Sequence, residues 1–248
     1  MNFEDRNLGR KIPTDFNHVS KYPFSAVAPE TVVNVEKKLK LPAWHWSHDQ
    51  GSEGSCVGFG TSMMMSIIND KQARDNGVKP YTNRYDPIWL WNRSKEIDEW
   101  SDTNPGDSNG TSVRAACDVL RTLGHVKIIR NNPLLPNISE GISTNRWATS
   151  VDEIRTAIGN GLPLSIGVYW YSNFDRPVLK GKEYWIGEGN LGSIRGGHCL
   201  TLYGASDKRQ AFSLKNSWGK QYPLVWIPYS TMQTLILQQG EFTLITDK

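Results

Sequence analysis

The sequence predicts an α+β protein whose helical N-terminal lobe and β-rich C-terminal lobe meet at a cleft. Apolar residues recur at helical spacing through the first half of the chain, whereas beyond Leu162 they alternate within short segments bounded by turn residues. The length of 248 residues is enough for one large domain or two small lobes. Because ligand sites tend to lie where lobes meet, the functional residues are expected in that cleft.

The first forty residues are polar and interrupted by Pro13, Pro23 and Pro29, which predicts an extended N-terminal arm over 1–40. Within this arm, residues 31–40 are amphipathic and are expected to form a short helix. The body is expected to span 41–248, with a helical lobe over 41–150 and a β lobe over 151–248.

Four helices are expected in the first two thirds of the body. They follow from apolar spacing and from end signals such as Asn76-Gly77 and the capping box that begins at Ser150. Five strands are expected later, from alternating apolar residues. The helices are predicted over 56–75, 85–99, 111–123 and from 150 onward, and the strands over 164–169, 198–203, 211–214, 224–227 and 241–245.

The composition excludes several classes of protein. With 28 Lys plus Arg against 25 Asp plus Glu, the charge is too balanced to indicate nucleic acid or an anionic membrane as a partner. No apolar run approaches the roughly 18 residues of a membrane span, and the N-terminal stretch lacks the apolar core of a signal peptide. A cytoplasmic or virion-associated protein is therefore expected. Three cysteines, an odd number, argue against a disulfide scaffold.

The chemistry is predicted at Cys56, which follows the Gly/Ser-rich segment 51–55 at the start of a predicted helix. Unpaired amides and the helix dipole favour an anion at this position, so a thiolate is expected there. A thiolate nucleophile needs an imidazole that exchanges its proton, and His198 begins a strand of the other lobe. Asn216 can hold that imidazole, and the Gln50 amide can help the Cys56 N–H to bind an oxyanion.

These fragments together resemble the papain-like cysteine peptidases: Gln50 to Phe59 around the cysteine, Gly196-Gly197-His198-Cys199, and Asn216-Ser217-Trp218-Gly219. His198 follows Cys56 by about 140 residues and Asn216 by about 160, close to the family spacing. The resemblance covers residue 41 to the C-terminus. It implies a papain-like two-lobe fold with an antiparallel, barrel-like C-terminal lobe and the active site between the lobes.

The resemblance also implies roles for individual residues. Cys56 is expected to be the nucleophile, His198 the general acid and base, Asn216 its orienting partner and Gln50 the oxyanion donor. Trp218 is expected to shield the His198–Asn216 hydrogen bond. The substrate is expected to be an extended polypeptide that pairs with the strip Asn109, Gly110 and Thr111. The pocket for its side chain two residues before the scissile bond is expected to be walled by Val113, Gly167, Gly196 and Gly197.

The chain departs from the family pattern at three positions. Glu53 stands where a disulfide cysteine is usual, Val57 replaces an aromatic residue, and Cys199 replaces a small residue. The lost bridge resembles bacterial or phage members without a long prosegment. None of the departures removes a proton-transfer group, although a negative charge at Glu53 near the thiol would disfavour its ionisation.

The simpler interpretations apply to the remaining reactive residues. Cys117 and Cys199 are expected to be buried and inert, and His18, His45, His48 and His125 to be surface or satisfied core residues. No metal-ligand spacing and no phosphate loop is recognisable, so no cofactor and no metal is expected.

The predicted function is a cysteine endopeptidase that acts through an acyl-enzyme. Two alternatives stay open at this point. The first is a papain-fold structural or binding component of a larger assembly such as a virion, docked through its N-terminal arm. The second is an amidase or transferase that uses the same Cys–His pair.

Overall fold

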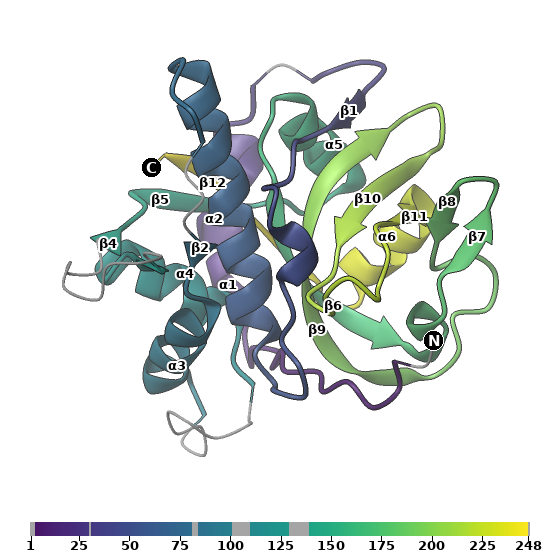
Figure 1. The fold of residues 1–248 in the computed structure, drawn as a ribbon, viewed down its shortest axis with the longest axis horizontal. Coiled ribbons are helices and arrows are strands. Elements are labelled where there is room, and N and C mark those ends of the chain that lie inside the picture. The colour runs from purple at the N-terminus through teal and green to yellow at the C-terminus, as the bar shows by residue number, and fades with distance from the viewer. Residues whose placement is uncertain (1–2, 30, 81–83, 101–109, 129–138, 248) are drawn as a thin grey trace.

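The computed structural model describes residues 3–29, 31–80, 84–100, 110–128 and 139–247. A long central helix, α2 (Cys56–Asp75), lies between a group of helices and a large sheet, as Figure 1 shows. It packs against α3 and α4 on one side and against strand β9 on the other. The predicted α+β class is therefore confirmed.

The large sheet brings most strands of the second half together in the order β5-β12-β6-β9-β10-β11-β8-β7, and β1 adds to β9. Neighbouring strands are antiparallel except β11 and β8. Its strands are β1 (Glu36–Lys38), β5 (Thr144–Trp147), β6 (Leu164–Tyr171), β7 (Val178–Lys180), β8 (Glu183–Trp185), β9 (Ile194–Ser206), β10 (Ala211–Lys215), β11 (Val225–Pro228) and β12 (Glu241–Asp247).

Three of the four expected helices begin near the predicted position at a residue whose side chain accepts a hydrogen bond from a free amide of the first turn. Asp86 caps α3 (Pro87–Ile97), Ser112 caps α4 (Val113–Thr122) and Ser150 caps α5 (Val151–Gly159). Helix α2 ends at Asp75 with Asn76 as its C-cap, followed by Gly77 in the left-handed region.

Other elements have no clear sequence signal. They are the helices α1 (Asn17–Lys21) and α6 (Tyr229–Leu237), the 3-10 turns η1 (Phe24–Ala26), η2 (His45–Ser47) and η3 (Ser172–Asp175), and the small sheet of β2 (Arg84–Tyr85), β3 (His125–Ile128) and β4 (Ser139–Glu140).

The helix expected over 31–40 is wrong. Residues 36–38 form strand β1, which pairs antiparallel with the end of β9, so that Lys38 lies opposite Gly204. A segment this short gains little from helical propensity, whereas the edge of β9 offers it ready hydrogen-bond partners.

The core forms two clusters of buried side chains that meet at α2. One fills the inner face of the sheet and includes Met63, and the other lies among α2, α3 and α4 and includes Met64 and Met65. Residues 56–68 of α2 are buried without interruption. The N-terminal end of this helix is consequently held rigidly against the sheet, which fixes the position of its first residue, Cys56.

Candidate active site

Cys56 is the first residue of α2, and its side chain is fully buried. Its sulfur accepts a hydrogen bond from the backbone amide of Gly9, at 3.3 Å between Gly9 N and Cys56 Sγ. A backbone hydrogen bond from Cys199 also favours the ionised form of the thiol. Cys199 follows His198 on β9, so the packing of α2 on β9 brings the predicted nucleophile and imidazole to the same place.

His198 lies in β9 opposite Val168 of β6. Its Nε2 is 2.9 Å from Oδ1 of Asn216, the residue that follows β10. Its ring packs against Trp170 and Trp218, with centroids 4.9 and 5.1 Å away. Among the described residues, Nδ1 of this buried ring has no hydrogen-bond partner. If Nε2 donates to Asn216, Nδ1 is the nitrogen that is left to exchange a proton with a thiol.

Gln50 is held by the loop that carries Asn216. Its backbone amide donates to the carbonyl of Ser217 at 2.8 Å, and its side-chain Oε1 accepts from Ser217 Oγ at 2.5 Å. The side-chain Nε2 is thereby directed elsewhere. It donates to the carbonyl of Glu53 at 2.7 Å and to the carbonyl of Asn7 at 3.2 Å. The side-chain amide of Gln50, which is predicted to bind an oxyanion, thus donates to two carbonyl oxygens in this structure.

The N-terminal segment 3–11 lies in the cleft over Cys56. Arg10 N donates to the carbonyl of Gly197 at 3.0 Å, Lys11 N to that of Thr111 at 2.9 Å, and Thr111 N to that of Gly9 at 2.9 Å. The predicted strip at Gly110 and Thr111 therefore does pair with an extended backbone, namely the chain's own, and in parallel orientation. Asn109 lies outside the described residues. Figure 1 shows this purple segment running from the N-terminal mark along the lower edge of the molecule, past β9 toward the lower end of α2.

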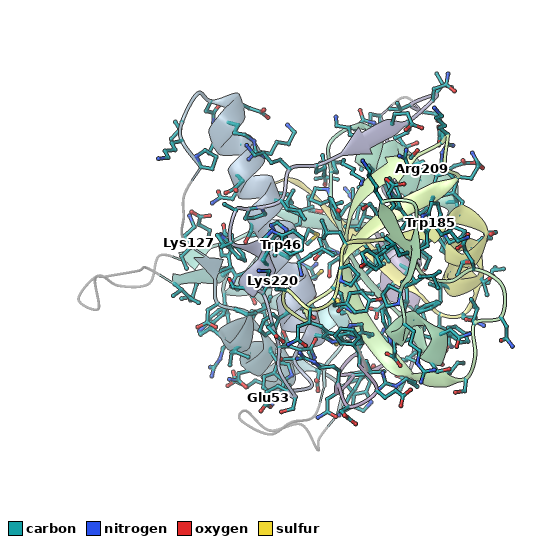
Figure 2. All side chains as sticks on the ribbon, turned by 45° about the vertical axis from the view of Figure 1, so that its right-hand side comes forward. Trp46, Glu53, Lys127, Trp185, Arg209 and Lys220 are labelled. Atoms are coloured by element: carbon teal, nitrogen blue, oxygen red, sulfur yellow. The ribbon has the colours of Figure 1, made fainter. Side chains whose placement is uncertain are left out.

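The beginning of the segment covers the other end of the site. Phe3 stacks on Trp218 with ring centroids 5.5 Å apart. Arg6 forms an ion pair with Asp49, 2.6 Å between Nη1 and Oδ1, and donates to the carbonyl of Gly51 at 2.9 Å. A groove of about 1140 Å³ runs on from Phe3 and is lined by residues such as Trp46 and Lys220, labelled in Figure 2.

Three glycines make this close approach possible. A Cβ on Gly9 would lie 1.7 Å from the carbonyl oxygen of Gly54, and one on Gly110 would lie 1.8 Å from that of Gly9. A Cβ on Gly197 would lie 2.2 Å from the carbonyl oxygen of Arg10. Each distance is far below van der Waals contact, so any side chain at these positions would separate the segment from the cleft.

The predicted side-chain pocket is occupied by Arg10. A Cβ on Gly167 would lie 2.7 Å from Val113 Cγ2 and 2.9 Å from Arg10 Nε, so these residues border one space. A Cβ on Gly197 would meet Arg10 Cδ at 3.1 Å, whereas one on Gly196 would meet only Leu8. Val113, Gly167 and Gly197 thus enclose the arginine side chain, and Gly196 does not.

Glu241 closes the inner end of this pocket, and the sequence analysis did not single it out. It begins β12 opposite Gly167. Its Oε2 accepts hydrogen bonds from Arg10 Nε at 3.1 Å and Nη2 at 3.0 Å, and both side chains are fully buried. The one signal in the sequence is an acidic residue at the start of the strand predicted over 241–245 in the β lobe.

Burial sets the ionisation of Cys56 and His198 in this structure. It raises the pKa of the Cys56 thiol to about 11, against the lowering effect of the Gly9 amide, and it lowers the pKa of His198 to about 4. Near neutral pH both groups are therefore uncharged. The depressed thiol pKa that the helix position predicted does not occur in this covered state, because burial outweighs the backbone hydrogen bonds that favour the thiolate.

The other reactive residues have structural surroundings. Cys117 and Cys199 are buried and free, as expected. His48 Nε2 lies 2.8 Å from the carbonyl of Phe59, and His125 Nε2 lies 2.7 Å from Ser62 Oγ, so both are satisfied core histidines. Glu53 is exposed at the lower edge of the molecule in Figure 2.

Within the described part of the chain, no group of three or more His, Cys, Asp or Glu side chains is arranged to hold a metal ion. In the same residues, no helix combines the length and the apolar character needed to cross a membrane.

Comparison with known proteins supports the fold. No family model and no curated protein matches this sequence. Solved structures do: a cysteine protease, xylellain, from Xylella fastidiosa superposes with a TM-score of 0.75 at 15% identity, over 98% of this chain and 97% of that one. Procathepsin B from Trypanosoma congolense gives 0.66 at 13% identity, over 98% and 88%. Procathepsin L 3 from Tenebrio molitor gives 0.59 at 13% identity, over 97% and 76%.

Proposed function

We propose that this chain, which has the fold of the papain-like cysteine proteases, is a cysteine endopeptidase in a self-covered state. The observation that carries the proposal is the hydrogen bond of 2.9 Å between His198 Nε2 and Asn216 Oδ1, with Nδ1 left unpartnered among the described residues. The next residue, Cys199, is hydrogen-bonded through its backbone to Cys56 at the N-terminal end of α2. An imidazole held in this way is oriented for proton exchange with a thiol at the helix terminus.

In the proposed reaction, Cys56 ionises by transferring its proton to His198 and attacks the carbonyl carbon of a peptide bond. The Gln50 amide and the backbone amide of Cys56 stabilise the negative oxygen that forms. His198 then donates its proton to the leaving amine, and the acyl-enzyme is hydrolysed by a water molecule that His198 deprotonates. Asn216 keeps the imidazole in the required orientation, and Trp218 covers that hydrogen bond.

Segment 3–11, which covers the cleft, is itself a poor substrate because of its orientation and direction in the cleft. Gly9 directs its N–H, not a carbonyl carbon, at the sulfur. Residues 9 and 10 run from Cys56 toward the predicted side-chain pocket, whereas a substrate that fills this pocket two residues before the cut runs from the pocket toward Cys56. The segment therefore occupies the cleft in the reverse direction.

The test uses the full chain with Gly9→Val, whose side chain would collide with the Gly54 carbonyl and uncover the cleft. This variant is expected to hydrolyse casein and to react with an epoxide thiol trap. Adding Cys56→Ala should abolish both, while adding Cys117→Ala, the matched control at a buried cysteine, should change neither. A variant whose Cys56 is alkylated by iodoacetamide but which hydrolyses no peptide bond would overturn the proposal.

The alternatives from the sequence make different predictions in the same assay. An amidase or transferase with the same Cys–His pair would act on cell-wall peptides or on an added amine but not on casein. The structural alternative was motivated by an arm that docks on a neighbour. Segment 3–11 instead makes its hydrogen bonds to its own chain, at Gly197, Thr111 and Cys56.

A further inference from the structure

The buried pair of Arg10 and Glu241 is the only ion pair among the described residues in which both side chains are fully buried. A carboxylate removed from water is costly unless a cation and hydrogen bonds compensate it. The compensating cation belongs to the segment that must leave before a substrate can enter. The open cleft would consequently present a carboxylate at the inner end of this pocket without the guanidinium that compensates it.

The pocket around Glu241 presents acceptors rather than donors. The Arg10 Nη2 donates to the carbonyl of Gln239 at 2.7 Å in addition to the carboxylate. Gln239 has a φ of 61°, in the left-handed region. The second carboxylate oxygen, Oε1, lies 3.4 Å from Nε2 of His18 and accepts no hydrogen bond from the described residues. A side chain that only donates satisfies this set, and guanidinium and ammonium groups are of that kind.

The residues around Arg10 leave space for a long side chain, and the acceptors at its end favour a positively charged group. Gly167 and Gly197 leave the space that the arginine stem fills, and Val113 supplies an apolar wall beside it. An apolar side chain would fill the same volume but would leave the carboxylate and the Gln239 carbonyl unpaired, which is far more costly than the burial it gains.

We propose that Glu241 determines the specificity of the cleft and selects substrates with arginine or lysine two residues before the cleaved bond. The inference rests on the proposed function, because it concerns the substrate of the same site. Arg10 of the covering segment and the basic side chain of a substrate then compete for one carboxylate.

The experiment compares three fluorogenic peptide amides that differ only at that position: arginine, its uncharged isostere citrulline, and leucine. The enzyme is the full chain with Gly9→Val. The expected kcat/KM is at least about tenfold higher for arginine than for citrulline, as a charge-assisted hydrogen-bond pair in a buried site requires. This comparison needs no change at Glu241, so it does not depend on whether a variant there folds.

A second measurement assigns the preference to Glu241. Glu241→Gln is expected to bring the arginine-to-citrulline ratio to about one. Glu188→Gln, a surface glutamate paired with Lys180, is the matched control and should leave the ratio unchanged. Equal rates for all three peptides, a preference for leucine, or an arginine preference that persists in Glu241→Gln would each overturn the inference. Hydrolysis of none of the peptides by an enzyme with accessible Cys56 would instead refute the proposed function.

Discussion

Replacing Gly9 by valine should open the cleft. Gly9 has an ordinary backbone conformation, so the substitution introduces no strain of its own, and only the lack of space opposes it. A Cβ would lie 1.7 Å from the Gly54 carbonyl oxygen and 2.2 Å from its carbon. Because Gly54 belongs to the loop that positions Cys56, the segment rather than the loop is expected to move.

The size of the effect follows from the contacts that are lost. Three backbone hydrogen bonds join Gly9, Arg10 and Lys11 to the cleft. At about 0.5–1.5 kcal/mol net for each, their loss disfavours the covered state by about 1.5–4.5 kcal/mol. This energy corresponds to an increase of about 10- to 1000-fold in the open population.

The assay is alkylation of Cys56 by iodoacetamide in the folded protein, followed by mass spectrometry of the peptide that contains it. The rate is expected to rise by about 10- to 1000-fold in Gly9→Val, since alkylation requires an exposed thiolate. Asp5→Ala, at an exposed position of the same segment, is the control and should react at the wild-type rate. If Gly9→Val reacts no faster than wild type while both react when unfolded, the segment does not control access to Cys56.

Three further predictions test other parts of the structure. In the folded state His198 has a pKa of about 4, below the ordinary 6.5, so the unfolded state binds a proton first as the pH falls. The free energy of unfolding of wild type relative to His198→Asn should therefore fall by on the order of 3 kcal/mol between pH 6.5 and pH 4. Urea unfolding at several pH values measures this, and a constant difference would contradict it. Ser150→Ala removes the cap on the Glu153 amide and should cost about 1 kcal/mol in the same assay; an unchanged midpoint would show that the cap contributes nothing. Gly167→Ala crowds Arg10 Nε and should speed Cys56 alkylation about tenfold, whereas wild-type kinetics would mean that the pocket yields instead.

The candidate site was largely predictable because its signals are local. Cys56 follows a Gly/Ser-rich loop, His198 follows two glycines, and Asn216 lies in a short turn. The expected role of each residue could therefore be inferred from its own short fragment of sequence. The antiparallel pairing of β6, β9 and β10 follows from their alternating patterns. Their order along the chain then limits how the three fragments can meet.

What the sequence did not predict depends on distant partners. The path of segment 3–11 is set by hydrogen bonds to Thr111 and Gly197, which no local pattern announces. The strand at 36–38 required the free edge of β9, which overrode a helical pattern. The sequence does not distinguish Glu241 from other acidic residues that begin a strand. Its position opposite Gly167 in the sheet, which places it in the pocket, follows only from the strand register.

If the chain is the proposed peptidase, segment 3–11 must be protected from the nucleophile that it covers, and the structure shows two features that protect it. It presents the Gly9 N–H, rather than a carbonyl carbon, to the sulfur. With the segment in place, Cys56 and His198 are both fully buried, so that the thiol keeps its proton and the imidazole stays neutral. Both protections end when the segment leaves, because rehydration lowers the thiol pKa and raises that of the imidazole. We therefore expect a single event to uncover the site and to activate the nucleophile. Across any series of variants in segment 3–11, the alkylation rate of Cys56 should then rise together with the peptidase activity.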